Sequence, residues 1–198
     1  MSSGILGGTF DPVHTGHLIL AEQARDQLGL ERVLWLPAAN PWRKAGEAVT
    51  PVEQRLAMVR LATADNDAFE VNTSELERAG PTYTGETLSG LRETLGGELV
   101  FLLGLDALFD LPNWHRPAEL IELAELGVAD RGASRPGPEA LDRLLPGLSA
   151  RVRWIEMPRI DISGTELRRR AAEGRSLRYL VPPGVEAYIA EHRLYATG

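Results

Sequence analysis

Cysteine is absent from this chain of 198 residues, so disulfides, thiolate metal sites and cysteine nucleophiles are all excluded. Lysine is nearly absent, because 20 of the 21 basic residues are arginine and Lys44 is the single exception. Long apolar runs are missing too: the richest, residues 99–105, is far shorter than the ~20 residues that span a bilayer. The first residues also lack the basic region of a signal peptide. We therefore expect a cytoplasmic protein that has no membrane partner.

The acidic charge balance limits the class of partner. A net charge of −7 and a pI near 5.2 argue against nucleic acid as the main partner, because a phosphate backbone demands a basic face. Small anionic substrates remain compatible, since they need only local positive charge. The length and the hydrophobic content of 43% predict one domain over residues 1–198, and they make no prediction about the oligomeric state.

Six short apolar runs typical of strands alternate with segments typical of helices. The runs are residues 5–6, 33–36, 69–71, 99–103, 126–129 and 152–155. This alternation predicts an α/β fold, a doubly wound, Rossmann-like parallel sheet with helices on both faces. Ligands in such a sheet bind beyond the carboxyl ends of the strands, where the strand order reverses. Four segments that follow predicted strands should meet there: residues 8–17, 38–45, 104–106 and 161–168.

Three helices have clear signals in the sequence. One begins after Thr50, a predicted N-cap, with Pro51 at the first helical position and Glu53 completing a capping box. The other two are residues 84–95, which carry a stripe of leucines, and a final helix after the two prolines at 182 and 183 that extends to His192. Residues 38–49 and 133–138 contain proline and glycine with little periodicity, so both are predicted loops.

Residues 8–17 read Gly-Thr-Phe-Asp-Pro-Val-His-Thr-Gly-His, between a predicted strand and a predicted helix. Such a turn gathers backbone N–H groups and the positive end of a helix dipole, which is how α/β proteins hold phosphate. His14 and His17, three residues apart at the helix mouth, should lie on one face and donate to phosphate oxygens as charge grows on a leaving group. A lone His-x-Gly-His would indicate a helix cap, but the preceding residues favour nucleotidyl transfer.

The segment after the last predicted strand, residues 162–168, opens another helix. Ser163 is a good N-cap and Glu166 stands at the capping-box position, so this pair alone has a structural explanation. Thr165 and Arg168 lie one turn apart, and we assign them to triphosphate binding. The two arginines that follow are expected on a solvated helix face.

Three further features leave alternatives open. Asp106, in the sequence Gly104-Leu105-Asp106 after the fourth predicted strand, could accept ribose hydroxyls or cap the next helix. Trp114 lies in a proline-bounded loop, and it could be a core residue or stack on a planar heteroaromatic ring. Lys44 could stand in its loop by chance or serve as a compact, mobile charge for phosphate, and we favour the phosphate role.

Taken together, these residues resemble the bacterial nicotinate-nucleotide adenylyltransferases, nearly from end to end. The opening Gly-Gly-Thr-Phe-Asp-Pro-x-His-x-Gly-His is typical of the wider nucleotidyltransferase superfamily. The narrower motifs are residues 81–88, residues 104–108 with 111–114, and residues 181–182 through 188–189 to 194–195. Pantetheine-phosphate adenylyltransferases generally have threonine at the position of His14. Cytidylyltransferases favour a sequence motif that residues 159–165 of this chain do not reproduce. Both families are therefore weaker fits.

The resemblance implies that ATP and nicotinate mononucleotide bind side by side, and that the mononucleotide phosphate attacks the α-phosphate of ATP in line. Pyrophosphate leaves and nicotinate adenine dinucleotide forms. Mg²⁺ would be bound by the ATP phosphates, because no dedicated carboxylate cluster is visible in the sequence. No residue is assigned to a metal. The implied site residues are the catalytic His14, His17, Lys44 and Arg168; the ATP-binding Gly8, Thr9, Phe10, Gly104, Asp106, Ser163 and Thr165; and the mononucleotide-binding Tyr83, Thr84 and Trp114.

Within the last group, the resemblance implies that Trp114 stacks on the pyridine ring. The backbone at Tyr83 and Thr84, near a helix start, would receive the nicotinate carboxylate and exclude the neutral amide. Two alternatives stand beside this prediction: an enzyme that uses nicotinamide mononucleotide, alone or in addition, and a nucleotide sensor without turnover. The sensor has no need of groups that stabilise a leaving group, so it is disfavoured by the intact His14, His17, Lys44 and Arg168.

The chain departs from the family pattern at two places. The family commonly has Pro-Pro-His-Lys after the second strand, whereas residues 40–44 read Asn-Pro-Trp-Arg-Lys, so Arg43 stands in place of the histidine and Lys44 is kept. The usual Ile-Ser-Ser-Thr is Ile-Ser-Gly-Thr at residues 162–165, which removes one hydroxyl.

Overall fold

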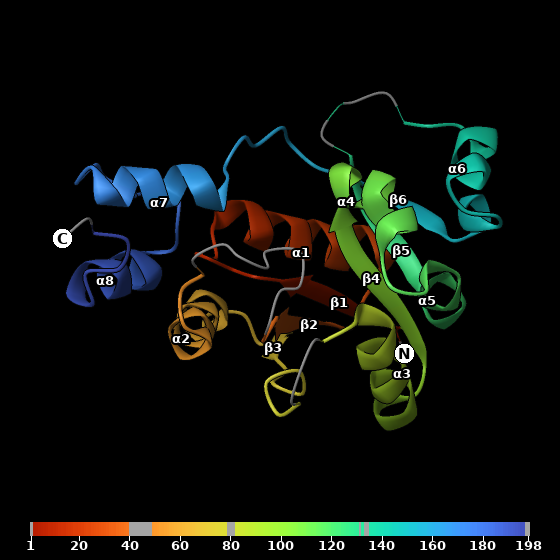
Figure 1. Cartoon of the computed structure of the whole chain (residues 1–198), viewed down its shortest axis with the longest axis horizontal. Helices are drawn as coiled ribbons and strands as arrows, with labels where there is room; N and C mark the ends of the chain where they lie inside the picture. The colour runs from red at the N-terminus through yellow and green to blue at the C-terminus, as the bar shows by residue number, and fades with distance from the viewer. Residues whose placement is uncertain (1, 40–48, 79–81, 131, 133–134, 197–198) are drawn as a thin grey trace.

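The computed structural model describes residues 2–39, 49–78, 82–130, 132 and 135–196 of the chain. Six parallel strands form one sheet in the order β3-β2-β1-β4-β5-β6 (Figure 1). The strands are β1 (Ser2–Gly8), β2 (Arg32–Pro37), β3 (Phe69–Val71), β4 (Glu98–Gly104), β5 (Glu125–Asp130) and β6 (Val152–Glu156). All six predicted strands are confirmed, and so is the doubly wound α/β fold. The strand order reverses between β1 and β4, so a ligand is expected at the carboxyl ends of these two strands.

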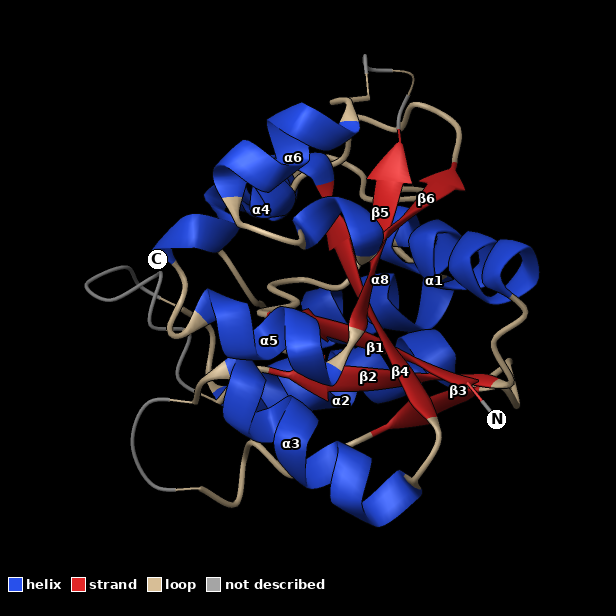
Figure 2. Ribbon diagram, turned by 90° about the vertical axis from the view of Figure 1, so that its right-hand side faces the viewer, coloured by secondary structure: helices blue, strands red, loops and turns tan. Residues whose placement is uncertain are grey.

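Helices cover both faces of the sheet, as Figure 2 shows with α3 and α5 on one side and α1 on the other. One face packs against α1 (Thr15–Leu28), α2 (Val52–Thr63), α7 (Gly164–Ala172) and α8 (Pro183–Glu191). The other packs against α3 (Thr84–Leu95), α4 (Leu105–Asp110), α5 (Pro117–Leu123) and α6 (Pro138–Leu144). Two short 3₁₀ turns, η2 (Leu111–Asn113) and η3 (Leu148–Ala150), complete the second layer.

The core consists of two apolar clusters, one on each face of the sheet. Successive side chains of a strand point to opposite faces, so neighbours along a strand belong to different clusters. In β2, Val33 and Trp35 are buried on the α1 side, whereas Leu34 and Leu36 are buried on the α3 side. Apolar runs buried on both faces are what a parallel sheet requires, because helices cover it on each side. These two clusters hold the strand ends, and the loops that follow them, in fixed positions.

The helix bounds correct three details of the sequence prediction. The first predicted capping box is wrong: α2 begins at Val52, Pro51 takes the N-cap position, and the backbone N–H of Thr50 donates to the carboxylate of Asp11. Pro138, predicted in a loop, is the first residue of α6, and α8 ends at Glu191, one residue before His192. The predicted helix over residues 84–95 agrees with α3 at both ends. Within the part of the chain that the structure describes, no helix is long and apolar enough to cross a membrane.

Candidate active site

The two histidines of the first motif lie together at the N-terminus of α1. His14 is the N-cap residue and His17 is the third residue of the helix, and their rings stack with centroids 3.7 Å apart and planes inclined by 23°. The backbone N–H of His14 donates to Nδ1 of His17 over 3.2 Å. Because Nδ1 of His17 accepts this bond, the neutral ring carries its proton on Nε2. The expectation that both rings share one face of the helix mouth is confirmed.

Close packing below the histidines sets their positions. The ring of Phe10 is buried and meets His17 edge-on, with centroids 5.1 Å apart. A Cβ on Gly8 would lie 3.0 Å from the Phe10 ring, and a Cβ on Gly16 would lie 3.2 Å from the His14 ring. The space beside Gly8 is therefore filled by Phe10. Any contact between Phe10 and a nucleotide is left to its main chain, because the side chain belongs to the core.

The start of α7 meets the β1–α1 loop (residues 9–14). Arg168 donates from Nη1 to the carbonyl oxygen of Asp11 over 2.7 Å and from Nη2 to the hydroxyl of Thr165 over 3.4 Å. The contact is tight, because a Cβ on Gly164 would lie 2.8 Å from that same carbonyl oxygen. Ser163 caps the helix, accepting the backbone N–H of Glu166 at its hydroxyl over 3.2 Å. The positive ends of α1 and α7 thus converge on one loop, an arrangement suited to an anion.

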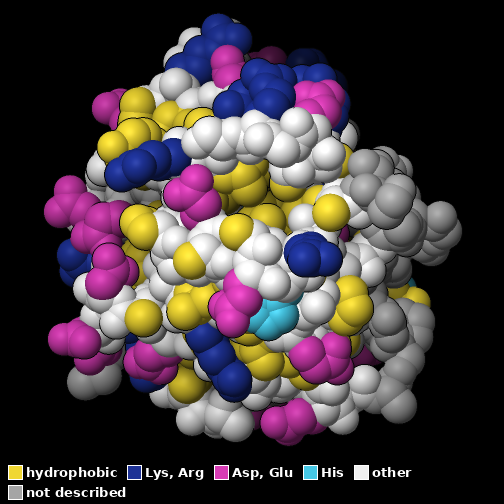
Figure 3. All heavy atoms as spheres, turned by 90° about the vertical axis from the view of Figure 1, so that its left-hand side faces the viewer, with side chains coloured by type: hydrophobic (Ala, Val, Ile, Leu, Met, Phe, Trp, Pro, Cys, Tyr) yellow, Lys and Arg dark blue, Asp and Glu magenta, His cyan; other side chains and the backbone are white. Residues whose placement is uncertain are grey.

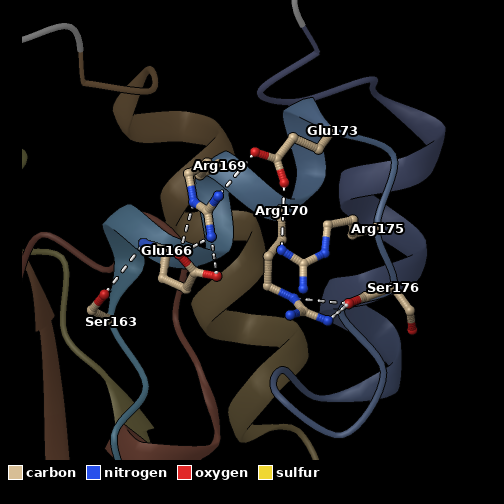
Figure 4. Close-up of polar contacts among 7 residues, drawn as sticks. All are labelled: Ser163, Glu166, Arg169, Arg170, Glu173, Arg175 and Ser176. Carbon is tan, nitrogen blue, oxygen red and sulfur yellow. Dashed lines mark hydrogen bonds and ion pairs between the residues drawn. The ribbon is translucent and has the colours of Figure 1, made fainter.

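Arg169 and Arg170, which follow Arg168, make their contacts away from the β1–α1 loop, as the sequence predicts. Figure 4 shows Arg169 paired with the carboxylates of Glu166 and Glu173, and Arg170 donating to the carbonyl oxygen of Ser176. Figure 3 shows basic and acidic side chains intermixed at the top of this side of the molecule. The charge of Arg169 is balanced by these two carboxylates and Arg170 is directed toward Ser176, so the positive charge that α7 presents to the β1–α1 loop comes from Arg168.

Gly104 and Asp106 lie where β4 ends, beside β1 at the reversal of strand order. Gly104 is the N-cap of α4 and Asp106, in the first turn of that helix, is exposed. Because α4 begins at Leu105, Asp106 lies inside the helix, and the N-cap position belongs to Gly104, which has no side chain. The capping alternative for Asp106 is therefore wrong, and a role toward ribose hydroxyls stays a prediction.

The residues assigned to the mononucleotide come from two neighbouring segments. Tyr83 is the N-cap of α3 and Thr84 is its first residue. The ring of Tyr83 stacks on His115 at 4.0 Å, which brings the start of α3 beside the segment that carries Trp114. Trp114 is only partly buried, and its Nε1–H donates to the carboxylate of Asp110 over 3.1 Å. His115 is not among the residues predicted from the sequence, although its position next to Trp114 is a usable signal.

Arg55 is the second residue that the sequence analysis missed. Its side chain is 1% exposed, and its guanidinium donates to the carbonyl oxygens of four residues, which are Thr9, Ala38, Ala39 and Thr50. Burial lowers the pKa of Arg55, and the negative charge of Asp11 acts in the opposite direction. Lys44 and Arg43, by contrast, fall in residues 40–48, which are outside the described residues.

The donor set around the β1–α1 loop suits phosphate oxygens. It consists of imidazole rings, a guanidinium and helix N-termini, whereas Mg²⁺ prefers carboxylate, carbonyl and water oxygens. No group of three or more His, Asp or Glu side chains that could hold a metal ion occurs among the described residues.

Comparison with known proteins places this site in a family. A family model described as cytidylyltransferase-like matches residues 5–170. The "Probable nicotinate-nucleotide adenylyltransferase" of Dehalococcoides mccartyi (strain CBDB1) is 45% identical over 198 residues, with 98% of this chain and 97% of that protein covered. The protein of the same name in Thermomicrobium roseum is 48% identical over 195 residues, with 98% and 91% covered. The chain belongs to the nicotinate-nucleotide adenylyltransferase family.

Solved structures agree on the fold. Plasmodium falciparum nicotinic acid mononucleotide adenylyltransferase complexed with NaAD superposes with a TM-score of 0.79 at 18% identity, covering 98% of this chain and 97% of that one. The same protein complexed with APC gives a TM-score of 0.77. Family membership makes this protein a nucleotidyltransferase, and the family predicted from the sequence motifs is confirmed.

Proposed function

We propose that the chain transfers the adenylyl group of ATP to nicotinate mononucleotide, giving nicotinate adenine dinucleotide and pyrophosphate. The observation that carries this proposal is the convergence of α1, α7, the stacked histidines and Arg168 on one loop, at the reversal of strand order. Family membership supports the choice of acceptor. We further propose that the reaction takes place in the cytoplasm and that neither nucleic acid nor a membrane takes part in it.

The chemistry that this site offers is positioning and charge stabilisation. When the mononucleotide phosphate attacks the α-phosphorus, the bond to the bridging oxygen breaks and negative charge moves onto the pyrophosphate. We assign the Nε2–H of His17 and the guanidinium of Arg168 to the oxygens that gain this charge. The start of α1 and the main chain of residues 8–10 would hold the triphosphate, with Ser163 and Thr165 at the start of α7. His14 and Lys44 complete the proposed catalytic set.

Mg²⁺ enters this proposal as part of the substrate, chelated by the ATP phosphates. The imidazole and guanidinium donors of the described site suit the phosphate oxygens of such a complex better than the ion itself. We assign no residue of the chain to the metal.

The acceptor subsite is proposed at the start of α3. The first backbone N–H groups of a helix have no partner within the helix, and they lie at its positive end. A nicotinate carboxylate placed at Tyr83 and Thr84 would gain from both, whereas a neutral amide would not. Trp114 has a partly buried ring whose plane is held by its bond to Asp110, which suits it to stack on a pyridine ring. Asp106 would accept ribose hydroxyls.

Pyrophosphate release tests the proposal directly. The protein is incubated with ATP and Mg²⁺, and with nicotinate mononucleotide, nicotinamide mononucleotide or phosphopantetheine in parallel. We expect rapid release with the acid alone. Release with the amide would replace the proposal by a nicotinamide or dual-specificity enzyme, and no release with any acceptor would favour a nucleotide sensor.

A further inference from the structure

Asp11 links its own loop to three distant segments of the chain through hydrogen bonds. Its carboxylate, on a residue that is 5% exposed, accepts the hydroxyl of Tyr195 at Oδ1 over 2.7 Å and the backbone N–H of Thr50 at Oδ2 over 3.3 Å. Its carbonyl oxygen accepts Nη1 of Arg168 over 2.7 Å. Hydrogen bonds to an ionised group are roughly twice as strong as neutral ones. The loop that carries His14 is therefore tied to the start of α2, to α7 and to the C-terminal segment.

Arg55 also binds the β1–α1 loop and Thr50, through hydrogen bonds to backbone carbonyl oxygens. All four of its acceptors are carbonyl oxygens, and they include Thr9 in the β1–α1 loop and Thr50, whose N–H bonds Asp11. Ala38 and Ala39, the other two, precede residues 40–48, and Thr50 follows them. Arg55 thus fixes residues on both sides of the segment that contains Lys44. The charge of Asp11 favours the cationic form of Arg55, which burial disfavours, so the two charges support each other.

The C-terminal segment also supports the other end of the loop. The backbone N–H of Thr15, the first residue of α1, donates to the carbonyl oxygen of Leu180 over 3.0 Å, and its hydroxyl donates to the carbonyl oxygen of Tyr179 over 3.1 Å. Residues 179–195 therefore contact Asp11 in the β1–α1 loop and Thr15 at the start of α1, on either side of His14. All of these contacts are made within the chain itself.

We propose that Asp11 is a positioning residue for adenylyl transfer, and that the hydroxyl of Tyr195 holds it in place. Through Asp11, Tyr195 fixes the distance between Arg168 and the His14–His17 pair. The inference rests on the proposed function, because its readout is the rate of transfer. The opposing explanation is that the Tyr195–Asp11 bond stabilises the fold and has no influence on the reaction.

The first test compares Tyr195→Phe, which deletes one oxygen, with Tyr188→Phe as matched control. Tyr188 packs against the same apolar cluster from α8, and we have given it no part in the site. A displacement of ~1 Å can cost on the order of 100-fold in rate, so we expect kcat to fall about tenfold in Tyr195→Phe. The KM values for both substrates should stay within about threefold, and Tyr188→Phe should keep the kcat of the wild type. Lower thermal stability with unchanged kcat would overturn the proposal.

The second test is a double-mutant cycle with Asp11→Asn. An amide keeps the shape of Asp11 but loses the charge, and its NH2 group replaces one of the two oxygens that accept from Thr50 and Tyr195. If Tyr195 acts through Asp11, adding Tyr195→Phe to Asp11→Asn lowers kcat little further, whereas independent residues give multiplied effects. Multiplied effects would overturn the proposal even if both single variants are slow.

Each assay is run with whichever acceptor the wild-type protein turns over. Wild-type activity with an acceptor other than nicotinate mononucleotide would refute the proposed function, and the effect of Tyr195→Phe could still be measured with that acceptor. A wild type that is active with nicotinate mononucleotide, together with an unaffected Tyr195→Phe, would refute the positioning role alone. A wild type silent with every acceptor would refute both.

Discussion

His14 and His17 stack with their ring centroids 3.7 Å apart, and the backbone N–H of His14 occupies Nδ1 of His17. This bond leaves the proton of a neutral His17 on Nε2 and fixes the plane of the ring. A donor held in this way loses little freedom when a phosphate oxygen gains charge, which is the condition for effective stabilisation of a transition state.

His17→Ala should therefore lower turnover far more than ATP affinity. Loss of one positioned donor to a developing oxyanion costs about 100- to 1000-fold in kcat. We expect a loss in that range, with the dissociation constant of ATP changed less than about fivefold, as measured by calorimetry. His192→Ala is the control, because His192 stacks on Tyr188 at the end of α8, outside the proposed site. Weaker ATP binding with normal turnover at saturating ATP would contradict the catalytic role.

Lys44 gives a prediction that rests on the sequence, since residues 40–48 are outside the described residues. Lys44→Ala should reduce kcat as strongly as His17→Ala, because a mobile ammonium near the triphosphate would be lost. Lys44→Arg should recover part of the rate, because a guanidinium keeps the charge in a larger, planar group. Steady-state rates at saturating substrates test both variants. A rate unaffected in Lys44→Ala would show that the only lysine of the chain is incidental.

The burial of Glu75 predicts that the stability of the folded chain toward unfolding depends on pH. Burial raises the pKa of Glu75, against the hydrogen bonds of Thr87 and Thr82 and the charge of Arg78. The folded chain then holds this proton at a pH where the unfolded chain has lost it, so stability falls as the pH rises from ~4.5 through the raised pKa. Glu75→Gln keeps an acceptor for Thr87 without the charge. It should therefore melt higher than the wild type at pH 8 and similarly at pH 4.5.

Thermal unfolding monitored by circular dichroism between pH 4.5 and 8 measures this difference. Each kcal/mol of change in the free energy of unfolding moves the melting temperature by roughly 2–4 °C in a chain of this size. Glu77→Gln is the control, because it removes the same charge from an exposed side chain nearby. A lower melting temperature for Glu75→Gln at pH 8 would mean that Glu75 is stabilised as a carboxylate.

Tyr195 should resist ionisation in the folded protein. Burial, followed by the hydrogen bond and the charge of Asp11, raises the pKa of its hydroxyl strongly. Tyrosine in an unfolded chain ionises near pH 10, so the stability that Tyr195 supplies is fully present below about pH 10 and is lost above it. Tyrosinate absorbance at 295 nm from pH 7 to 11 should give equal amplitudes for the wild type and Tyr195→Phe. An amplitude lower by one tyrosine in the variant would contradict this, with the unfolded wild type providing the amplitude of all four.

The sequence predicts well what depends on neighbouring residues. Each of the six strands contains a short apolar run, although β1 extends from Ser2 to Gly8 around the predicted residues 5–6, and the leucine stripe predicts α3 with the bounds that the structure has. Contacts between distant residues have no such signal. Tyr195 and Asp11 lie 184 positions apart, and nothing in either neighbourhood indicates that they pair.

Arg55 illustrates the same limit. An arginine on a surface helix is expected to reach solvent, and its burial depends on four carbonyl groups that only the folded loops bring together. Thr50 has the residue type and spacing of an N-cap, yet its backbone N–H bonds Asp11 and the helix begins later. In both cases a tertiary hydrogen bond decides the local structure.

Gly164 supplies a prediction in which two effects of one methyl group oppose each other. Alanine in place of glycine within the first turn of a helix ordinarily stabilises a protein by about 0.4–1 kcal/mol, because the unfolded chain loses freedom. At Gly164 the new Cβ would lie 2.8 Å from the carbonyl oxygen of Asp11, which is backbone and yields little. Gly164→Ala should therefore push α7 away from the β1–α1 loop.

We expect Gly164→Ala to lose stability and to raise the KM for ATP, since the bond from Arg168 to Asp11 spans the same gap. Gly85→Ala is the stability control, because Gly85 lies in the first turn of α3 with nothing within 4 Å of its Cβ position. It should gain stability where Gly164→Ala loses it, as measured by urea unfolding. A Gly164→Ala variant that is stabilised like Gly85→Ala would show that the gap between α7 and the β1–α1 loop widens at no cost.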